Sequence, residues 1–379
     1  MITKRRLALF STLSAAPAFA APFLAIGDNA ELFLTARTEV RYEDNVTFST
    51  NNEIKDEILE VVPGAEVLFG KNSSVKGSFQ AFERLVAFSD NTKLNSNLSN
   101  LVFDSAYEGS KLNVGAKASF RELNQNSRDQ VNAPTLVRRD ASEAGLNGEY
   151  SVTEKSKVAL AGRYNRTQYK VGGYADQTNY AVPANYFFAI SEKVDLSTGI
   201  QYRKNEIKEI VANTNSDSED YYFNVGSRGE FTAKLSGKFD IGYNLRMPDA
   251  AGADDETGLG LNAGLVYAYS PKTSFTLDLS RDFSVGSDAS GTEVSSIFLG
   301  ASTSLTAAWS ISANLGYSQY DYLAGGRTDD YILAGVGVTY TYNEYINVEA
   351  GYALNDNSSD IATAEFTANV LRIAANFRY

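Results

Sequence analysis

The sequence of 379 residues contains no cysteine, no histidine, one tryptophan and two methionines. Without thiols and imidazoles, the chain offers no disulfide, no Ser-His-Asp or Cys-His catalytic site, and no metal site built on those ligands. The acidic pairs Asp254-Asp255 and Asp329-Asp330 remain as loop candidates for acid–base chemistry, but adjacent acids are common in solvated loops. We therefore expect neither an enzymatic activity nor a cofactor.

Long hydrophobic runs are also missing. After residue 20, no stretch approaches the roughly 20 apolar residues that a transmembrane helix needs. The first part of the chain combines a basic start at residues 4–6, a short apolar run over residues 7–13 and the small-residue motif Ala18-Phe19-Ala20. This order is typical of a secretory signal peptide. We expect export, cleavage after Ala20 and one mature domain over residues 21–379.

Helical periodicity is rare, and apolar residues instead recur at every second position. The C-terminal stretch LRIAANFRY alternates to its last residue, and similar alternation is found over residues 111–123, 235–247 and 346–355. A period of two indicates β-strands with two chemically different faces. Each segment is about as long as the roughly 9–11 residues that a tilted strand needs to cross a bilayer.

The connections between these segments alternate in length. Short turns such as EGSK, TEKS and SPKT alternate with longer polar loops, for example NQNSRDQVNAPTLVRRD and KEIVANTNSDSED. This pattern predicts an all-β fold: a transmembrane antiparallel up-and-down β-barrel of about 18 strands, with short periplasmic turns and longer extracellular loops. Pro63 and Pro183 fall inside predicted strands, where we expect β-bulges.

A soluble β-sandwich also alternates and turns, but its strands are usually only about 5–6 residues long. The tyrosines argue against it, because they sort by strand direction. Strands that run toward the long loops carry tyrosine late, as at Tyr42, Tyr164 and Tyr243. Strands that run toward the short turns also carry it late, as at Tyr150 and Tyr340. Two tyrosine rings at opposite ends of an apolar band are typical of the two interfaces of a membrane.

The polar alternate positions are predicted to face the lumen, where charges of both signs are found. Barrels of 16–18 strands leave an aqueous channel, so these charges are candidates for a selective pore lining. Alternatively, the charges pair across the wall and stabilise a narrow or plugged barrel. We favour the pore, because no plug-like segment precedes the first strand. The pore-lining candidates are Arg37, Arg41, Lys117, Arg121, Arg163, Arg203, Arg228, Lys238, Asp240, Arg246, Asp278, Glu349 and Arg372.

The chain is acidic overall, with a net charge of −12. An acidic surface does not attract nucleic acid, so no nucleic-acid partner is expected. Acidic loops such as NTNSDSED offer the oxygen ligands that Ca²⁺ and Mg²⁺ prefer, but they lack the spacing of an EF-hand or of a calcium-binding β-roll. We predict no metal site.

The motif Tyr42-Glu43-Asp44-Asn45-Val46, followed by a second strand that contains Pro63-Gly64, resembles the opening of the Putative beta-barrel porin 2 family. The length of the chain, its alternating segments and its terminal aromatic residue agree with this resemblance. The resemblance implies an outer-membrane β-barrel, and several members of the family are associated with exopolysaccharide or capsule export. It brings no agreed functional residues to this sequence.

These observations together favour an outer-membrane channel, and most specifically a conduit for an exported exopolysaccharide. Phe187, Tyr222 and Tyr320 are predicted on the lumen face, where aromatic rings can stack on sugars. Two alternatives stay open. One is a general diffusion porin for small solutes or ions, and the other is a structural or adhesive surface protein that acts through its acidic loops.

The expected location is the outer membrane of a Gram-negative-type bacterium, in contact with outer-membrane lipid and lipopolysaccharide. The last strand, which ends in Tyr379, resembles the C-terminal signal that the barrel-insertion machinery reads. It is expected to pair with the first strand, so that no open edge is left in the bilayer. A polysaccharide and periplasmic export proteins are further candidate partners.

Overall fold

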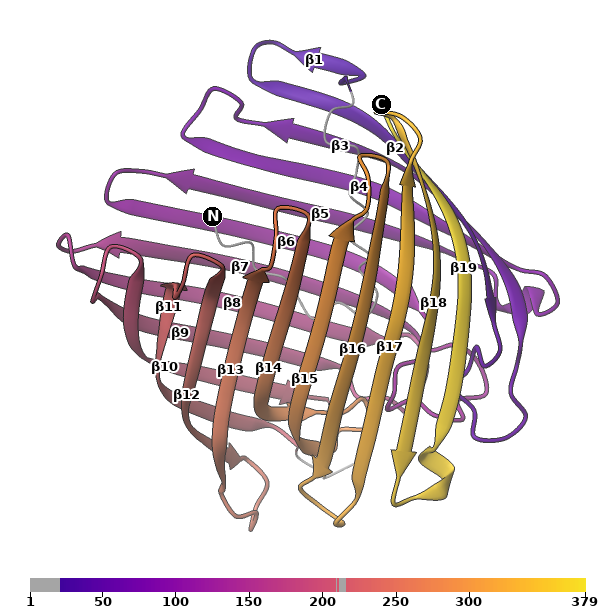
Figure 1. The fold of residues 1–379 in the computed structure, drawn as a ribbon. Helices are drawn as coiled ribbons and strands as arrows, with labels where there is room; N and C mark the ends of the chain where they lie inside the picture. Colours follow the sequence, from indigo (N-terminus) through magenta and orange to yellow (C-terminus); the bar gives the residue numbers. More distant parts are fainter. Residues whose placement is uncertain (1–20, 209, 211–215) are drawn as a thin grey trace.

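The structure is a computed structural model that describes residues 21–208, 210 and 216–379. In this part of the chain, eighteen long strands form one antiparallel sheet that curls into a ring (Figure 1). The predicted signal peptide and its cleavage site lie outside the described residues. The long strands are β2 (Ala30–Glu43), β3 (Asp56–Phe69), β4 (Val75–Phe88), β5 (Ser96–Glu108), β6 (Leu112–Asn124), β7 (Arg138–Ser151), β8 (Ser156–Tyr169), β9 (Gln177–Ala189), β10 (Val194–Ile207), β11 (Ser218–Glu230), β12 (Leu235–Pro248), β13 (Glu256–Ala268), β14 (Thr273–Val285), β15 (Gly291–Ser304), β16 (Trp309–Tyr322), β17 (Thr328–Thr341), β18 (Ile346–Ser359) and β19 (Phe366–Arg378).

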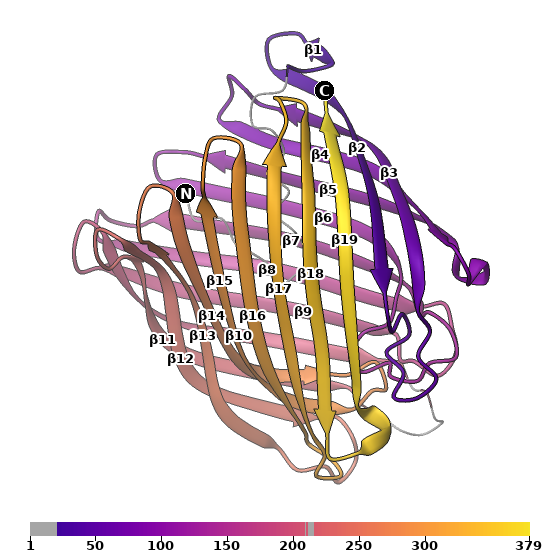
Figure 2. The ribbon, with the colours of Figure 1, turned by 45° about the vertical axis from the view of Figure 1, so that its right-hand side comes forward.

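The ring closes where the last strand meets the first long one. β19 pairs with β2 from Val370–Glu43 to Arg378–Thr35, and Figure 2 shows yellow β19 beside indigo β2. The contact continues to the final residue, because the Leu34 N–H donates to the Tyr379 carbonyl at 2.7 Å and the Tyr379 N–H donates to the Leu34 carbonyl at 2.9 Å. The closed sheet leaves no long strand unpaired. The predicted barrel of about 18 strands is confirmed.

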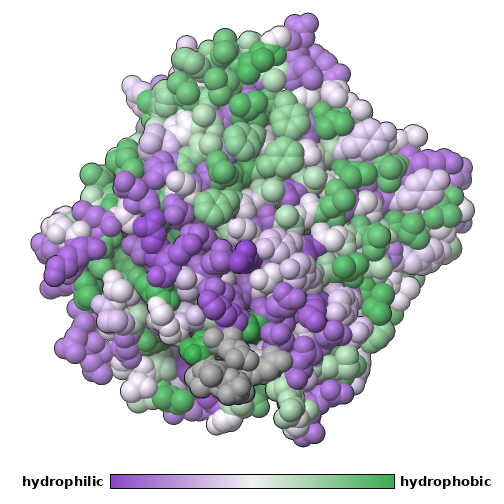
Figure 3. Space-filling view, turned by 180° about the vertical axis from the view of Figure 1, so that it is seen from behind, coloured by the Kyte–Doolittle hydropathy of each residue, from purple (hydrophilic) through white to green (hydrophobic). Residues whose placement is uncertain are grey.

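The two faces of the wall differ as the alternation predicts. Apolar side chains such as Val40, Leu160 and Leu371 are exposed on the outer face, and Figure 3 shows hydrophobic residues (green) over much of one side, with polar residues (purple) among them. Outward-facing tyrosines cluster toward the loop end, where the rings of Tyr164 and Tyr180 lie 5.5 Å apart. An outer surface that is apolar between aromatic residues suits a lipid bilayer.

The strands are longer than the roughly 9–11 residues that cross a bilayer. Near the long loops their outward-facing residues become polar, as at Glu83, Glu122 and Arg138, and Glu122 accepts a hydrogen bond from Arg138 at 3.1 Å. The strands therefore extend beyond the apolar band on the loop side. The C-terminus and the short turns lie at the opposite end of the barrel (Figure 1).

The two prolines inside strands do not mark bulges, so that prediction is wrong. The register of β3 against β4 runs from Val61–Leu85 to Gly64–Phe82 with no extra residue on either strand. Pro63 still pairs with Ala36 of β2 and interrupts the ladder only on the β4 side. Pro183 behaves in the same way between β10 and β8. Because proline has no backbone N–H, it removes hydrogen bonds to one neighbouring strand only, and the register of the strands is unchanged.

A short strand, β1 (Leu24–Ile26), adds an antiparallel partner to the start of β2 at the short-turn end. Two single-turn 3₁₀ helices, η1 (Thr92–Leu94) and η2 (Ala362–Ala364), lie in long loops. Among the described residues, no helix is long and apolar enough to cross a membrane.

Candidate functional site: a charged lumen with a loop across its mouth

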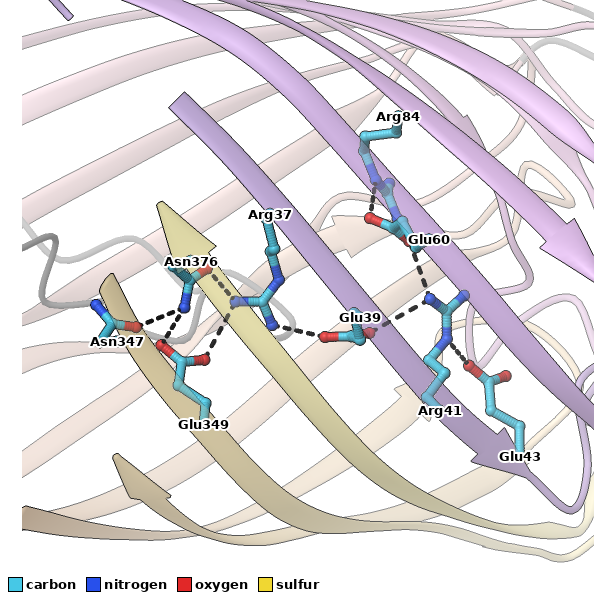
Figure 4. A network of polar contacts seen from close by, with 9 residues as sticks. All are labelled: Arg37, Glu39, Arg41, Glu43, Glu60, Arg84, Asn347, Glu349 and Asn376. Carbon is cyan, nitrogen blue, oxygen red and sulfur yellow. Dashed lines mark hydrogen bonds and ion pairs between the residues drawn. The ribbon is translucent and has the colours of Figure 1, made fainter. Parts of the chain in front are cut away.

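Charged and amide side chains from five neighbouring strands meet on the inner face at the seam between β19 and β2 (Figure 4). Arg37 donates to Glu39 at 2.6 Å, to Glu349 of β18 at 3.1 Å and to Asn376 of β19 at 2.8 Å. Its guanidinium therefore links three strands across the closing seam. A charged group that is partly removed from water needs such partners, and here both signs are supplied by adjacent strands.

The same network continues through Glu60 of β3. Its carboxylate accepts two hydrogen bonds from Arg84 of β4, both at 2.8 Å, and a third from Arg41 of β2 at 2.9 Å. Only 8% of the Glu60 side chain is exposed. Arg41 also binds Glu39 and Glu43 on its own strand. The seam is thus a continuous chain of alternating charges, and Glu60 is the acid that joins two arginines.

A second inner cluster surrounds Asp220 of β11 near the loop end. Arg203 of β10 binds this carboxylate at 2.6 Å, and Arg246 of β12 binds it at 2.7 Å. Arg203 also reaches Asp282 of β14 at 2.7 Å, four strands away around the ring. The tip of β14 leaves β13 beyond the Leu261–Arg281 pair and approaches β9 and β10, which explains this long-range contact.

A third cluster lies on the inner face near the short turns. Arg228 of β11 binds Glu149 of β7 at 2.7 Å and Asp195 of β10 at 3.0 Å, and its guanidinium lies 3.5 Å from the centre of the Phe187 ring. Lys157 of β8 binds the same Asp195 at 3.1 Å. The acids of this cluster are therefore neutralised by their neighbours.

The strand registers put all thirteen predicted pore-lining residues on this inner face. Arg163 and Lys238 are exposed there and have no ion-pair partner among the described residues. Asp240 accepts a hydrogen bond from the Tyr222 hydroxyl at 2.7 Å. That the thirteen residues line a conducting pore stays a prediction. Several of the thirteen form ion pairs, among them Arg37, Arg41, Arg121, Arg203, Arg228, Arg246 and Glu349.

Several acids that complete the clusters were not predicted, among them Glu43, Glu149 and Asp220. Alternation with the outward-facing Tyr150 could have placed Glu149 on the inner face, since the two are adjacent in β7. The partner of each acid could not be found in this way. A contact between β7 and β11 depends on the curvature of the wall, and alternation carries no information on curvature.

The three predicted aromatic residues lie on the inner face, but in two of them one face of the ring is covered. The Arg228 guanidinium covers one face of Phe187, and the Arg128 guanidinium lies 3.5 Å from the centre of the Tyr320 ring. Both arrangements are cation–π contacts. Stacking of a sugar on these rings therefore has to use the other face.

One long loop crosses the mouth of the barrel. This mouth loop, residues 125–137, connects β6 to β7, and Arg128 within it binds Asp329 of β17 at 2.6 Å. In the ring of strands, β16 and β17 lie across the barrel from β6 and β7. The loop thus spans the opening from one wall to the other.

Asp329 is the anchor on the far wall. Its side chain is fully buried, and it accepts hydrogen bonds from Arg128, Arg327 and Ser359. Asp329 and Asp330 were predicted in a loop, but they belong to β17, and the Asp330 carboxylate accepts a bond from Tyr317. A buried carboxylate with two arginine partners holds the loop through charge-assisted hydrogen bonds.

Apolar contacts hold the mouth loop at both walls. Leu136 packs in a buried cluster with Ile58 and Leu98 on the near wall, and Val131 packs against Tyr331 and Phe366 on the far wall. This burial supplies a non-directional stabilisation in addition to the ion pairs.

Two further loops fold into the mouth and bind the mouth loop. From residues 44–55, the Thr47 carbonyl accepts a bond from Asn126 at 2.7 Å. From residues 286–290, the Ser287 N–H donates to Asp129 at 2.6 Å. All four non-glycine residues with a positive φ in the described chain lie in these three loops: Phe48, Asn52, Asn132 and Ala289. Such strained backbone persists only where packing holds it, and it is common in segments that switch between conformations.

The side chain of Asp129 is half-buried in the mouth loop. Burial alone raises its pKa, but the hydrogen bonds from Ser287 and Ser127 and the charge of Arg128 outweigh that effect and hold the pKa below its usual value. The ionised form of Asp129 therefore favours the position of the mouth loop in this structure. Because the pKa is lowered in this position, the contribution is complete above the ordinary pKa of about 3.9 and is lost as the pH falls below it.

We expect the mouth to stay closed from pH 8 to pH 5 and to loosen only below about pH 4. The open probability of single channels in planar bilayers, measured from neutral to acidic pH, tests this. The Asp129→Asn variant should be more open at neutral pH and should show a weaker acid dependence, since protonation of Asp329 would still break the ion pair with Arg128. Opening of the wild type between pH 7 and 5 would contradict the assignment, because it would require another titrating group.

Comparison with known proteins identifies the family. A family model described as Putative beta-barrel porin 2 matches residues 106–379, which is more than half of the chain. The chain belongs to this family. The suspected family is thereby confirmed, by a part of the sequence that does not include the motifs at residues 42–46 and 63–64. Membership in the Putative beta-barrel porin 2 family agrees with the closed barrel and makes the protein an outer-membrane β-barrel porin.

Other similarities are more distant. The Putative uncharacterized protein YaiT of Escherichia coli K12 is 26% identical over an alignment of 241 residues, which covers 55% of this chain and 24% of that protein. The chain thus spans about a quarter of the length of this curated relative. Among solved structures, Pseudomonas aeruginosa OpdK is 12% identical with a TM-score of 0.49, covering 92% of this chain and 99% of that one. Acinetobacter baumannii OccAB3 is 10% identical with a TM-score of 0.48, covering 93% and 100%.

Proposed function

We propose that this member of the Putative beta-barrel porin 2 family is a gated outer-membrane conduit for an exported polysaccharide, and that the mouth loop holds it closed at rest. The observation that carries the proposal is the Arg128–Asp329 contact across the barrel. A general diffusion porin needs a mouth that stays open. A conduit that works only during export has to be closed at other times, because an open lumen of this size would leak solutes.

The chemistry of the inner face supports a sugar as cargo. Four side-chain amides on this face, from β7, β8, β9 and β11, have no hydrogen-bond partner among the described residues. An amide both donates and accepts, so it can exchange hydrogen bonds with successive sugar hydroxyls as a chain passes. Because most inner carboxylates are paired with arginine or lysine, the wall does not attract one type of small ion strongly. The four amides are those of Asn147, Asn165, Asn185 and Asn224.

Deletion of the gene in the source bacterium, with surface and periplasmic polysaccharide measured separately, tests the cargo. We expect surface polysaccharide to fall and periplasmic polymer to accumulate, and the wild-type gene to restore export. A variant with alanine at Asn147 and Asn224 should restore it only in part. Unchanged export in the deletion strain would refute the polysaccharide cargo, while steady wild-type channel openings would favour a diffusion porin.

A further inference from the structure

An apolar hollow of about 530 Å³ lies on the outer face of the barrel, over β6 to β10 near the short turns. Its volume falls within the roughly 300–1,000 Å³ of typical ligand sites. Its outward-facing lining residues lie opposite to the charged inner face. They include Leu112, Gly148, Tyr150, Val158, Ala184 and Tyr186.

The hollow arises from small residues set between large ones. Among the outward-facing residues nearest the short turns, Tyr150 and Tyr186 both pair with Val158, so two rings flank a smaller side chain. In the next row, Gly148 and Ala184 both pair with Leu160. The glycine and the alanine leave space on either side of Leu160, which is exposed and also lines the hollow. The result is a groove with an apolar floor and tyrosine walls.

Two lysines stand at the end of this groove that faces the short turns. Lys111 directly precedes Leu112 of the groove, and Lys155 lies in the turn that leads into β8. Both are exposed, and neither ammonium group has an ion-pair partner among the described residues. The turns also carry Glu154 beside Lys155 and Glu192 beside Lys193. The polar end of the groove thus offers free cations with acids next to them.

We propose that this groove binds one glycerophospholipid of the periplasmic leaflet. Its acyl chain would occupy the hollow between Tyr150 and Tyr186, and its phosphate would meet Lys111 and Lys155. Tyrosines at this depth of the membrane present a ring to the acyl chain and a hydroxyl to the headgroup region. The adjacent acids suit a headgroup that carries an ammonium as well as a phosphate, so phosphatidylethanolamine is the expected species.

The shape argues for a lipid rather than for a second copy of the chain. An interface with twofold symmetry places a patch against itself, and two facing hollows would leave a void. Voids lose dispersion contacts and are disfavoured. A flexible acyl chain can follow a groove that a rigid barrel wall cannot fill.

Two glycines provide a matched test. A side chain at Gly148 would enter open space in the hollow, and a side chain at Gly162 would also enter open space, but on the outer face beyond the hollow. Neither position has a positive φ, so both should accept leucine without disturbing the sheet. Gly148→Leu, on β7, fills the proposed site. Gly162→Leu adds the same side chain on the neighbouring strand β8, outside the hollow.

Each purified variant is loaded with palmitoyl-oleoyl phosphatidylethanolamine, phosphatidylglycerol or diacylglycerol, and bound lipid is counted by native mass spectrometry. We expect one phosphatidylethanolamine per wild-type barrel and per Gly162→Leu barrel. Gly148→Leu should weaken binding about tenfold, as expected when roughly two methylene groups lose their contacts. Replacing Lys111 and Lys155 by glutamine should weaken the binding of both phospholipids but not the binding of diacylglycerol.

Equal retention in Gly148→Leu and the wild type would overturn the proposal. A wild-type oligomer that Gly148→Leu splits into monomers would also overturn it, because the hollow would then hold a second copy. Equal binding of diacylglycerol and the phospholipids would remove the role of the lysines and refute a headgroup site.

Discussion

Replacing Arg128 by alanine is expected to open the channel. This single change removes the ion pair to Asp329 and the contact with the Tyr320 ring on the far wall. A hydrogen-bonded charge pair and a cation–π contact together contribute about 3 kcal/mol, which corresponds to more than a 100-fold change in the ratio of closed to open channels. Planar-bilayer recordings should show brief, rare openings in the wild type and long openings in the variant.

The control for this variant is Arg138→Ala. Arg138 begins β7, only ten positions from Arg128, but it pairs with Glu122 on the outer face. Its loss should leave the open probability within about twofold of the wild type, since exposed pairs contribute little. If Arg128→Ala and Arg138→Ala gave the same recordings, the mouth loop would not be held by the far wall.

Replacing Glu60 by alanine is expected to lower the stability of the barrel more than any other single change in the seam. Among the described residues, Glu60 is the only ion-pair partner of Arg84, and it also binds Arg41. Removing one member of a buried charge network leaves its partners uncompensated, which costs about 3 kcal/mol. The free energy of unfolding in guanidinium, measured in lipid vesicles, should fall by that amount.

The matched change is Glu31→Ala on β2. Glu31 also forms an ion pair with a basic residue, Lys71, but this pair lies at the exposed rim near the short turns. Its removal should change the free energy of unfolding by no more than about 0.5 kcal/mol. Equal losses of unfolding free energy in the two variants would mean that an ion pair of the inner network stabilises the barrel no more than an exposed one.

The barrel architecture could be predicted because the alternation of apolar and polar residues is visible within each strand separately. Alternation marks the two faces, and the final stretch ending in Tyr379 shows that even the last residue belongs to the sheet. Tyrosines such as Tyr164 mark the ends of the membrane band without any knowledge of the tertiary structure. The mistaken bulge at Pro63 has a local reason as well, because a missing N–H breaks one ladder and shifts no register.

The mouth could not be predicted in the same way. Arg128 and Asp329 are separated by 201 residues, and neither stands in an alternating pattern that would point to the other. Their contact depends on the diameter of the ring and on how a loop without periodicity folds across it. The length and polar composition of this loop indicate only that it has a functional role, and they do not indicate which wall it contacts. Its path is determined by burial of residues such as Leu136 and Val131, which only the structure shows.

The central claim, that the mouth loop closes the channel, can be tested by a reversible cross-link. The chain has no cysteine, so Arg128→Cys and Asp329→Cys introduce two unique thiols, one on the mouth loop and one on β17. A reducible bis-methanethiosulfonate reagent joins them, and single-channel current is recorded before and after reduction. We predict a closed channel while the link is intact and an open channel after reduction, since the native ion pair is gone. A current that is the same in both states would contradict the account.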